Sequence, residues 1–330
     1  MHAWQKVKNV GYENSSRVHN LKKEVGGNNG KRSDFNTMKK SKSIFVFAML
    51  LVPVIHFLVF WVYVNFSSIL FAFQKTTATG VVYTLENFEY AIKEIFRQGS
   101  TISSALKNTL TTWFLDNVIM FALSILWSWF IYKRIKGGAV FRVIFYIPVI
   151  VSGAAVTTIF TFMLQAKGPI GQLYQTLFDT KEVPSFLLDE RYAMKTVLTY
   201  IFLTGFGGNM VLLSGAMSRI PKEMMESAIM DGCGMWREIF HFVIPLCWST
   251  LSTMLIISLA ALFTASGPIL LLTGGAGNTF TLSYWIFYQV KFLGKYNQPA
   301  ALGLIFTFIG MPIVLFVRWF FGKFYTDLEY

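Results

Sequence analysis

Charged residues, cysteine and histidine are all scarce in this chain of 330 residues. Only 14% of the residues are charged and 54% are hydrophobic, whereas soluble globular domains carry about 25% charged residues. Two long stretches, 43–74 and 239–290, contain no Asp, Glu, Lys or Arg. This composition excludes an ordinary soluble domain and indicates an integral membrane protein.

The scarcity of metal-binding and nucleophilic side chains restricts the chemistry that the chain can perform. Cys233 and Cys247 are the only cysteines, and the four histidines are scattered. A metal site needs several such ligands at short spacing, so we predict none here. The segment GGNNGKRS at 26–33 lacks the spacing of a phosphate-binding P-loop. We therefore expect no cofactor in this chain, and no catalytic cluster of the kind that an integral membrane enzyme requires.

The polar segment 1–43 is strongly basic. It contains ten Lys or Arg residues but only three acidic ones, and it shows no periodicity of apolar residues. A basic tail can bind nucleic acid, but beside a membrane span it more often sets the orientation of the protein or contacts anionic lipid. We predict a mostly disordered cytoplasmic tail that binds no nucleic acid.

Six apolar segments are long enough to cross a bilayer, which takes about 20 residues in a helix. They lie at 44–66, 108–132, 142–164, 193–214, 246–272 and 300–321. The aromatic segment 279–299 is expected to form an interfacial helix. We therefore predict an all-α membrane protein in which residues 44–330 form one domain of six transmembrane helices.

The distribution of basic residues between the spans predicts their orientation. The connection at 133–142 has four Lys or Arg residues and no acidic residue, which is typical of a cytoplasmic loop. With six spans, both termini then lie in the cytoplasm. The charged segment between the fourth and fifth spans, 215–245, lies there too.

Within that charged segment, residues 220–245 read IPKEMMESAIMDGCGMWREIFHFVIP. Pro221 suits the first position of a helix. Glu223 and Glu226 follow it near the positive end of the helix dipole. Gly232 can adopt the left-handed conformation that ends a helix. The pattern predicts a short helix, a sharp turn and a second helix.

The first of these helices has an apolar side made of residues at helical spacing, which are Met224, Met225, Ala228 and Ile229. Such a helix can lie on lipid head groups, but membrane-surface helices favour Lys and Arg on their polar side. This one carries Glu226 and, just after it, Asp231. An apolar face with carboxylates favours a groove on a partner protein, where a carboxylate can meet an arginine.

The spacing of these residues resembles the cytoplasmic EAA loop of permeases of binding-protein-dependent ABC importers. In that pattern Glu-Ala-Ala is followed by Gly and then by Ile-x-Leu-Pro. The corresponding residues are Glu226-Ser227-Ala228, Gly232 and Phe242-Val243-Ile244-Pro245. The preceding Ile220-Pro221 and the Asp231-Gly232 pair resemble the carbohydrate-transporting branch, such as maltose-type and multiple-sugar permeases.

Three further segments resemble the same family. Glu86-Asn87-Phe88 is similar to the "NF" that follows the first span. Residues 105–110 (ALKNTL) are similar to the motif that opens the second span, and residues 272–275 (LTGG) to the one after the fifth. The resemblance covers about residues 44–325, and the basic tail precedes it.

The resemblance implies a six-helix permease subunit of the type I ABC importer kind, with no enzymatic activity of its own. Such permeases pair with a second homologous permease subunit, usually as a heterodimer, and with two cytoplasmic ATPase subunits that bind Mg-ATP. An extracellular solute-binding protein delivers the substrate. The first charged helix would be the coupling helix, and its ATPase-coupling residues would be Glu226, Ser227, Ala228, Asp231, Gly232, Ile244 and Pro245.

Polar residues at membrane depth are costly and often functional. Asp116 and Asn117 lie in the second predicted span, and Asn209 lies in the glycine-rich part of the fourth. They are candidates for a substrate pathway. Hydrogen bonding between helices is the alternative role for Asn209, and structural pairing is the alternative for Asp116.

Two alternatives remain beside a sugar importer. A secondary transporter would often show internal repeats and several intramembrane carboxylates, and this chain shows no repeat and only Asp116. An ABC permease for a solute other than a sugar would share every motif described above. The sequence does not identify a particular sugar.

Overall fold

The structure is a computed structural model that describes residues 45–77, 80–180 and 182–324. The predicted basic tail at 1–43 lies outside the described residues. The chain divides into two compact units, Met1–Ser68 and Ile69–Tyr330. In the first unit the described residues belong to the apolar helix Phe45–Phe73, which includes the π-helical segment η1 (Phe57–Tyr63) and continues as α2 (Val64–Phe73).

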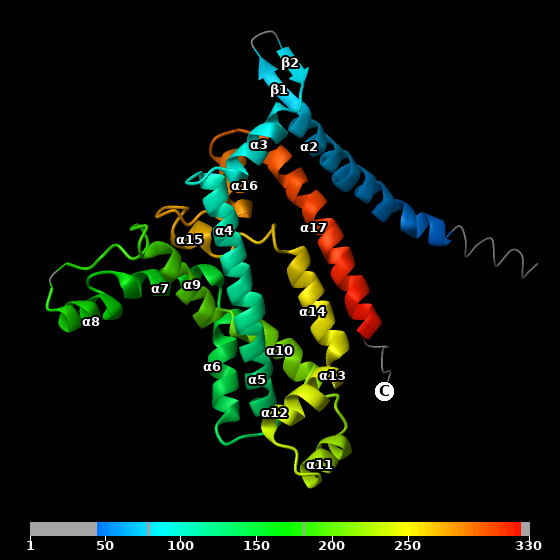
Figure 1. The fold of residues 1–330 in the computed structure, drawn as a ribbon, viewed down its shortest axis with the longest axis vertical. Coiled ribbons are helices and arrows are strands. Elements are labelled where there is room, and N and C mark those ends of the chain that lie inside the picture. The colour runs from blue at the N-terminus through cyan, green and yellow to red at the C-terminus, as the bar shows by residue number, and fades with distance from the viewer. Residues whose placement is uncertain (1–44, 78–79, 181, 325–330) are drawn as a thin grey trace, which may run out of the picture. The chain divides into compact units, whose positions relative to one another are not determined.

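The described part of the second unit is mostly helical, with one short hairpin (Figure 1). Its elements in chain order are β1 (Gln74–Thr77), β2 (Gly80–Tyr83), α3 (Glu86–Phe96), α4 (Thr101–Phe114), η2 (Leu115–Met120), α5 (Phe121–Tyr132), α6 (Gly138–Ile150), α7 (Gly153–Leu164), α8 (Pro169–Phe178), α9 (Ala193–Thr204), α10 (Phe206–Met217), α11 (Lys222–Met230), α12 (Met235–Glu238), η3 (Ile239–Val243), α13 (Ile244–Leu246), α14 (Trp248–Ala260), α15 (Ile269–Leu272), α16 (Leu282–Lys291) and α17 (Asn297–Phe324).

Four of the six predicted spans are single helices that are long and apolar enough to cross a membrane. They are Phe45–Phe73, Thr101–Tyr132, Ala193–Met217 and Asn297–Lys323. These helices are longer than the predicted spans, because polar or amphipathic residues form additional helical turns at their ends. The second span, for instance, begins at Thr101, where the Ser100 side chain caps the helix by accepting a hydrogen bond from the Ser103 amide.

The third predicted span, 142–164, is not one helix. It is divided into α6 and the following helical stretch Gly153–Phe178, and these two parts meet at 103°. Val151 and Ser152 between them are not helical, with ψ of 144° and 129°. Pro148 near the end of α6 also removes one backbone donor. The apolar composition continues across the break, which is why the prediction of a single helix is wrong.

The fifth predicted span, 246–272, is also wrong as one helix. Its start agrees with α14, which begins at Trp248 just after a bend of 77° from the helical stretch Met235–Leu246. α14 then ends at Ala260, and Gly267, with φ of +60°, precedes the short α15. If each bent pair is counted as one span, the described residues provide six spans.

The largest buried cluster in the second unit lies where α10 packs along α5. It contains Leu213 and Met217 from α10, Met225 from α11, Val243 from η3 and Leu251 from α14. The charged segment after the fourth span therefore shares one core with the spans on either side of it.

A close approach between α10 and α6 depends on a glycine. A Cβ atom added to Gly207 would lie 2.4 Å from the backbone oxygen of Phe145, and one added to the neighbouring Gly208 would meet nothing within 4 Å. Small residues allow helix backbones to approach in this way. Gly207 is therefore required by packing, whereas Gly208 is not.

The helix α16 falls within the segment 279–299, where we expected an interfacial helix, but it is shorter than that segment. Leu282, Tyr284 and Trp285 are buried, and α16 packs against α4 and α17. One face of α16 is therefore part of the protein core.

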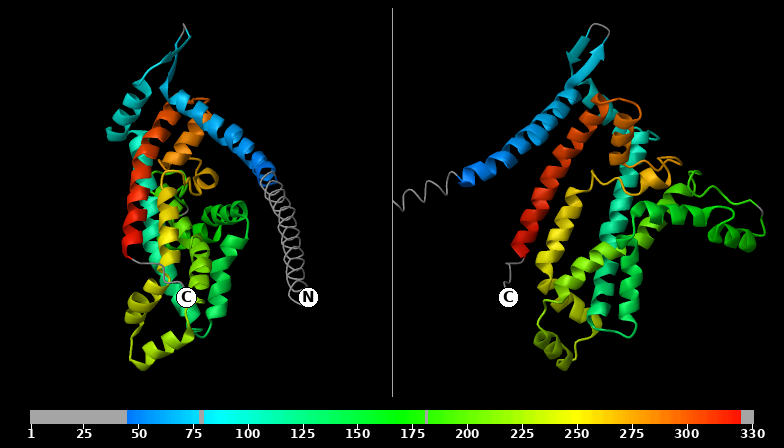
Figure 2. Two further views of the ribbon diagram at one scale, coloured as in Figure 1. Left: turned by 90° about the vertical axis from the view of Figure 1, so that its right-hand side faces the viewer. Right: turned by 180° about the vertical axis from the view of Figure 1, so that it is seen from behind.

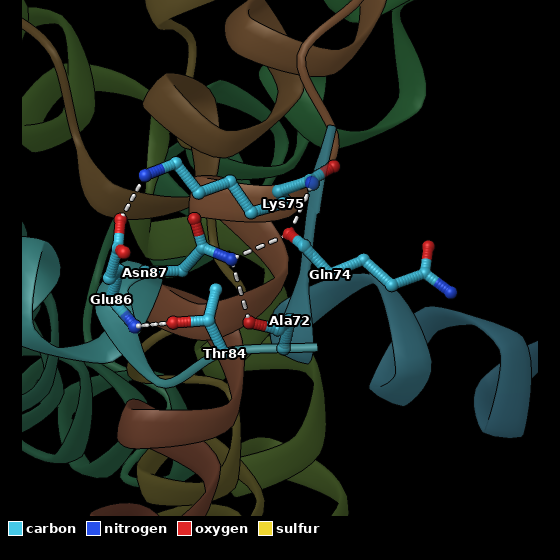
Figure 3. Close-up of polar contacts among 7 residues, drawn as sticks. Ala72, Gln74, Lys75, Thr84, Glu86 and Asn87 are labelled. Carbon is cyan, nitrogen blue, oxygen red and sulfur yellow. Dashed lines mark hydrogen bonds and ion pairs between the residues drawn. The ribbon is translucent and has the colours of Figure 1, made fainter. Parts of the chain in front are cut away.

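The segment that resembles the "NF" motif ties α3 to the end of α2 (Figure 3). The Asn87 side-chain amide donates to the backbone oxygens of Ala72, at 3.0 Å, and Gln74, at 2.8 Å. Beside it, Lys75 on β1 forms an ion pair with Glu86. The asparagine thus satisfies carbonyls that the end of the helix leaves free.

The segment 105–110 contacts the chain just beyond the segment 272–275. The Asn108 side-chain amide on α4 donates to the backbone oxygens of Asn278, at 2.8 Å, and Phe280, at 3.0 Å. The Thr109 hydroxyl accepts from the amide of Leu282 at 2.9 Å. These bonds hold the turn that follows α15 against the middle of α4, in the second span.

Candidate functional site

The candidate site is the segment between α10 and α14, and its first element is the predicted short helix, α11. Pro221 lies immediately before it, at the N-cap, with φ of −57° and ψ of 132°. Glu223 is in the first turn, where a carboxylate favours the helix dipole. The sequence predicts both Glu223 and Glu226 near the positive end of the helix dipole, but only Glu223 lies there. Glu226 lies one turn further along the helix.

The turn after α11 adopts the predicted left-handed conformation at Gly232, whose φ is +72°. The Gly232 amide donates to the backbone oxygen of Ile229 at 3.0 Å, and the Cys233 amide donates to that of Ala228 at 3.0 Å. This pair of hydrogen bonds is the Schellman motif that commonly ends a helix at a glycine. The prediction of a sharp, glycine-dependent turn is confirmed.

The two faces of α11 are clearly different. Met225 and Ala228 are buried in the core that α10 and α14 share. Ile229 and Met230, in contrast, are 55% and 87% exposed, so the predicted apolar side is correct at Met225 and Ala228 and wrong at Ile229. Glu226 lies on the exposed side, as do Ser227, Asp231 and Gly232.

The exposed side of the segment therefore combines carboxylates with apolar side chains. Trp236 and Phe240 extend it, because both are about 60% exposed and their rings stack with centroids 6.2 Å apart. Exposed apolar side chains that lie beside charged ones are typical of a surface that a partner protein covers. The other two predicted coupling residues, Ile244 and Pro245, are half-buried where the helix approaches its bend.

The role of Glu238 was not predicted from the sequence. Its carboxylate is buried, accepts a hydrogen bond from the Trp129 indole nitrogen at 3.0 Å and forms an ion pair with Lys133 at 2.7 Å. A signal was present, because Glu238 lies three residues after Met235 and four before Phe242, the spacing of one apolar helix face. An acid on an apolar face needs a partner.

The Glu238 ion pair brings together the two loops that were predicted to be cytoplasmic. Lys133 begins the basic connection 133–142, and Glu238 lies in the second charged helix. Both views show α11, α12 and the α5–α6 connection at the same end of the second unit (Figures 1 and 2).

The predicted pathway residues are in different environments. Asn117 accepts a hydrogen bond from the Ser258 hydroxyl on α14, and its own amide donates to the backbone oxygen of Trp113 at 3.1 Å. Asp116 has no hydrogen-bond or ion-pair partner within the described part of the chain, and its carboxylate faces Gly205 between α9 and α10. Asn209 is half-buried, and its side chain likewise has no hydrogen-bond partner among the residues described.

The comparison with protein families decides the class of this chain. The model of the family described as "Binding-protein-dependent transport system inner membrane component" matches residues 114–328. The chain belongs to that family. The match includes the whole of the candidate site, from α11 to α14.

Two relatives of this inner membrane component are sugar permeases. The "Multiple sugar-binding transport system permease protein MsmF" of Streptococcus mutans is 26% identical over 273 residues, which are 82% of this chain and 92% of that protein. The "Maltose/maltodextrin transport system permease protein MalF" of Shigella flexneri is 28% identical over 218 residues, which are 61% of this chain. The match spans only 41% of the length of that maltose permease.

Solved structures with the same fold come from bacterial alginate transporters. One is a "bacterial alginate ABC transporter in complex with alginate pentasaccharide-bound periplasmic protein", with a TM-score of 0.71 over 84% of this chain and 93% of that one, at 22% identity. The other, from a transporter for "the acidic polysaccharide alginate", has a TM-score of 0.73 at 21% identity. The six-span ABC permease fold is thereby shown, and this inner membrane component is a multi-pass protein of the cell membrane.

Proposed function

We propose that this chain is the transmembrane permease subunit of an ATP-driven importer that moves a sugar or oligosaccharide across the cytoplasmic membrane by alternating access. The family match over the segment from α11 to α14 carries this proposal. An extracellular solute-binding protein delivers the substrate. The chain itself performs no catalysis, because Mg-ATP is bound and hydrolysed on two separate cytoplasmic ATPase subunits.

The partner complex pairs this chain with a second homologous permease subunit. A heterodimer is the expected form, with one ATPase subunit under each permease. In this arrangement the N- and C-termini and the segment 215–245 face the cytoplasm. The contact between Lys133 and Glu238 supports a common side for the two charged loops, because it joins them directly.

The helix α11 is proposed to be the coupling helix that docks in a cleft of the ATPase. Its buried side is anchored in the core by Met225 and Ala228. Its exposed side presents Glu226 for a basic residue of the ATPase, with Ile229 and Met230 as apolar anchors. Closure of the ATPase dimer would then move α11, and the spans that share its core would move with it.

The substrate is proposed to be a carbohydrate because both relatives are sugar permeases, one of them matching 82% of this chain. Asp116, Asn117 and Asn209 remain the proposed pathway residues. Asn209 is the strongest of the three, because its amide has no partner among the described residues and could meet a sugar hydroxyl, whereas the Asn117 side chain already joins the second span to α14. An ABC permease for a different solute would use the same α11 geometry.

The proposal is tested by reconstituting the complex in liposomes and measuring ATP-driven uptake of labelled oligosaccharides. Glu226→Arg is expected to abolish uptake and weaken ATPase binding, because it places a cation where the proposal requires a carboxylate. Glu182→Arg is the matched control, since that exposed carboxylate lies outside the charged segment. Uptake by the Glu226→Arg complex at the rate of the control would contradict the proposal.

A further inference from the structure

The buried carboxylate of Glu238 is unusual in this chain. Of the Asp, Glu, Lys and Arg side chains in the described ranges, it alone is fully buried, with 3% of its surface exposed. It lies at the end of α12, six residues after the turn at Gly232. A buried charge is tolerated only when it is paired and hydrogen-bonded, so its partners show what it connects.

Both partners of Glu238 come from the end of one span, α5. The same carboxylate oxygen, Oε1, accepts from the Trp129 indole nitrogen at 3.0 Å and meets the Lys133 ammonium at 2.7 Å. The ammonium also lies 5.7 Å from the centre of the Trp129 ring. Lys133 is the C-cap of α5, where a cation favours the negative end of the helix dipole. The three side chains form one cluster that joins α12 to α5.

The cluster continues the path that begins at the coupling helix. Met225 on α11 packs in the same core as Trp129, Ile239 and Val243. The helix that carries Glu238, Met235–Leu246, follows the Schellman turn directly and leads to the bend before α14. A displacement of α11 is therefore passed through this shared core both to the helix that carries Glu238 and to the spans.

We propose that Glu238 is a positioning residue that couples α11 to the second span, holding α12 in one register on the end of α5 through Lys133 and Trp129. Apolar packing alone would allow α12 to slide or rotate on α5, whereas a charge-assisted pair with a second directional hydrogen bond has one favourable geometry. Replacing a buried ion pair with apolar groups often preserves stability. The cluster therefore fixes the direction in which α12 and α5 move together, rather than adding to stability. This inference rests on the proposed function.

The deciding experiment uses the complete complex, with both permease subunits, the ATPase and the solute-binding protein, in liposomes. Glu238→Met combined with Lys133→Met removes both charges and leaves no unpaired ion in the core. We expect this variant to assemble and to hydrolyse ATP, but the number of substrate molecules imported per ATP should fall about fivefold or more, the size of a typical loss of coupling between sites. Lys133→Arg, which retains the cation, should preserve that ratio.

The ratio of uptake to hydrolysis separates positioning from a structural role. Loss of folding lowers the amount of complex, but it does not change the ratio in the complexes that assemble. If the double variant fails to assemble, Glu238→Gln gives the same test, because its amide oxygen still accepts from Trp129 while the ion pair is lost. A wild-type ratio in the assembled variant would overturn the inference. Absence of ATP-dependent uptake in the wild-type complex would instead contradict the proposed function.

Discussion

The turn at Gly232 allows a graded test of the coupling-helix geometry, because the structure separates backbone strain from steric conflict. Its φ of +72° is left-handed, yet a Cβ atom added there would meet nothing within 4 Å. Substitutions at this position therefore act through the backbone alone. We expect uptake to decrease in the order Gly232, Gly232→Asn, Gly232→Ala and Gly232→Pro.

The size of each effect follows from the conformation. A residue with a Cβ atom costs about 1–2 kcal/mol in the left-handed region, and asparagine tolerates that region better than most residues. Alanine should therefore reduce uptake without abolishing it. Proline fixes φ near −65°, which is incompatible with +72°, and it removes the amide that donates to Ile229 at 3.0 Å. We expect Gly232→Pro to abolish the turn and with it uptake.

The assay is ATP-driven uptake in liposomes, together with co-purification of the ATPase with the permease pair. Gly234→Ser is the matched control, because Gly234 has an ordinary φ of −73°, open space around it and an N-cap position that serine favours. It should transport normally. Normal uptake and normal ATPase association by Gly232→Pro would show that the left-handed turn is not needed for coupling.

Three further outcomes follow from the packing of the spans and from the proposed pathway. Gly207→Ala should destabilise the protein by about 1–3 kcal/mol, the usual cost of overpacking, because the added methyl group meets the backbone of Phe145. The control Gly208→Ala meets nothing and should leave the melting temperature in detergent unchanged. Asn108→Ala should cost about 2 kcal/mol in thermal unfolding, since it removes two hydrogen bonds to loop carbonyls at about 1 kcal/mol each, and a wild-type melting temperature would show that these bonds contribute nothing. Asn209→Ala should raise the substrate concentration for half-maximal uptake without lowering stability, and an unchanged value would remove Asn209 from the pathway.

The elements that were predictable from the sequence are those with local causes. Uninterrupted apolar length predicted the fourth and sixth spans, and one glycine with the correct spacing predicted the turn after α11. The helix breaks at Ser152 and after Ala260 were not predictable from apolar length, because no charged residue interrupts either segment. Composition reports whether a segment can lie in a membrane, but a break is decided by backbone conformation at one or two residues.

The site shows the same division between local and long-range causes. The exposed position of Glu226 followed from its place in an amphipathic helix. The burial of Glu238 did not, since it depends on Trp129 and Lys133, more than a hundred residues earlier in the chain. The exposure of Ile229 was missed because a nine-residue helix that packs through Met225 and Ala228 leaves its last turn outside the core.

The most direct test of the account is whether this chain imports a solute only with an ATPase partner. The measurement is uptake of a labelled oligosaccharide into liposomes that contain the permease pair and enclosed ATP, with the solute-binding protein outside, in the presence and absence of the ATPase subunits. The account predicts uptake only when the ATPase is present and a hydrolysable nucleotide is supplied. Equal uptake by the permease pair without the ATPase would contradict it and would indicate a secondary transporter.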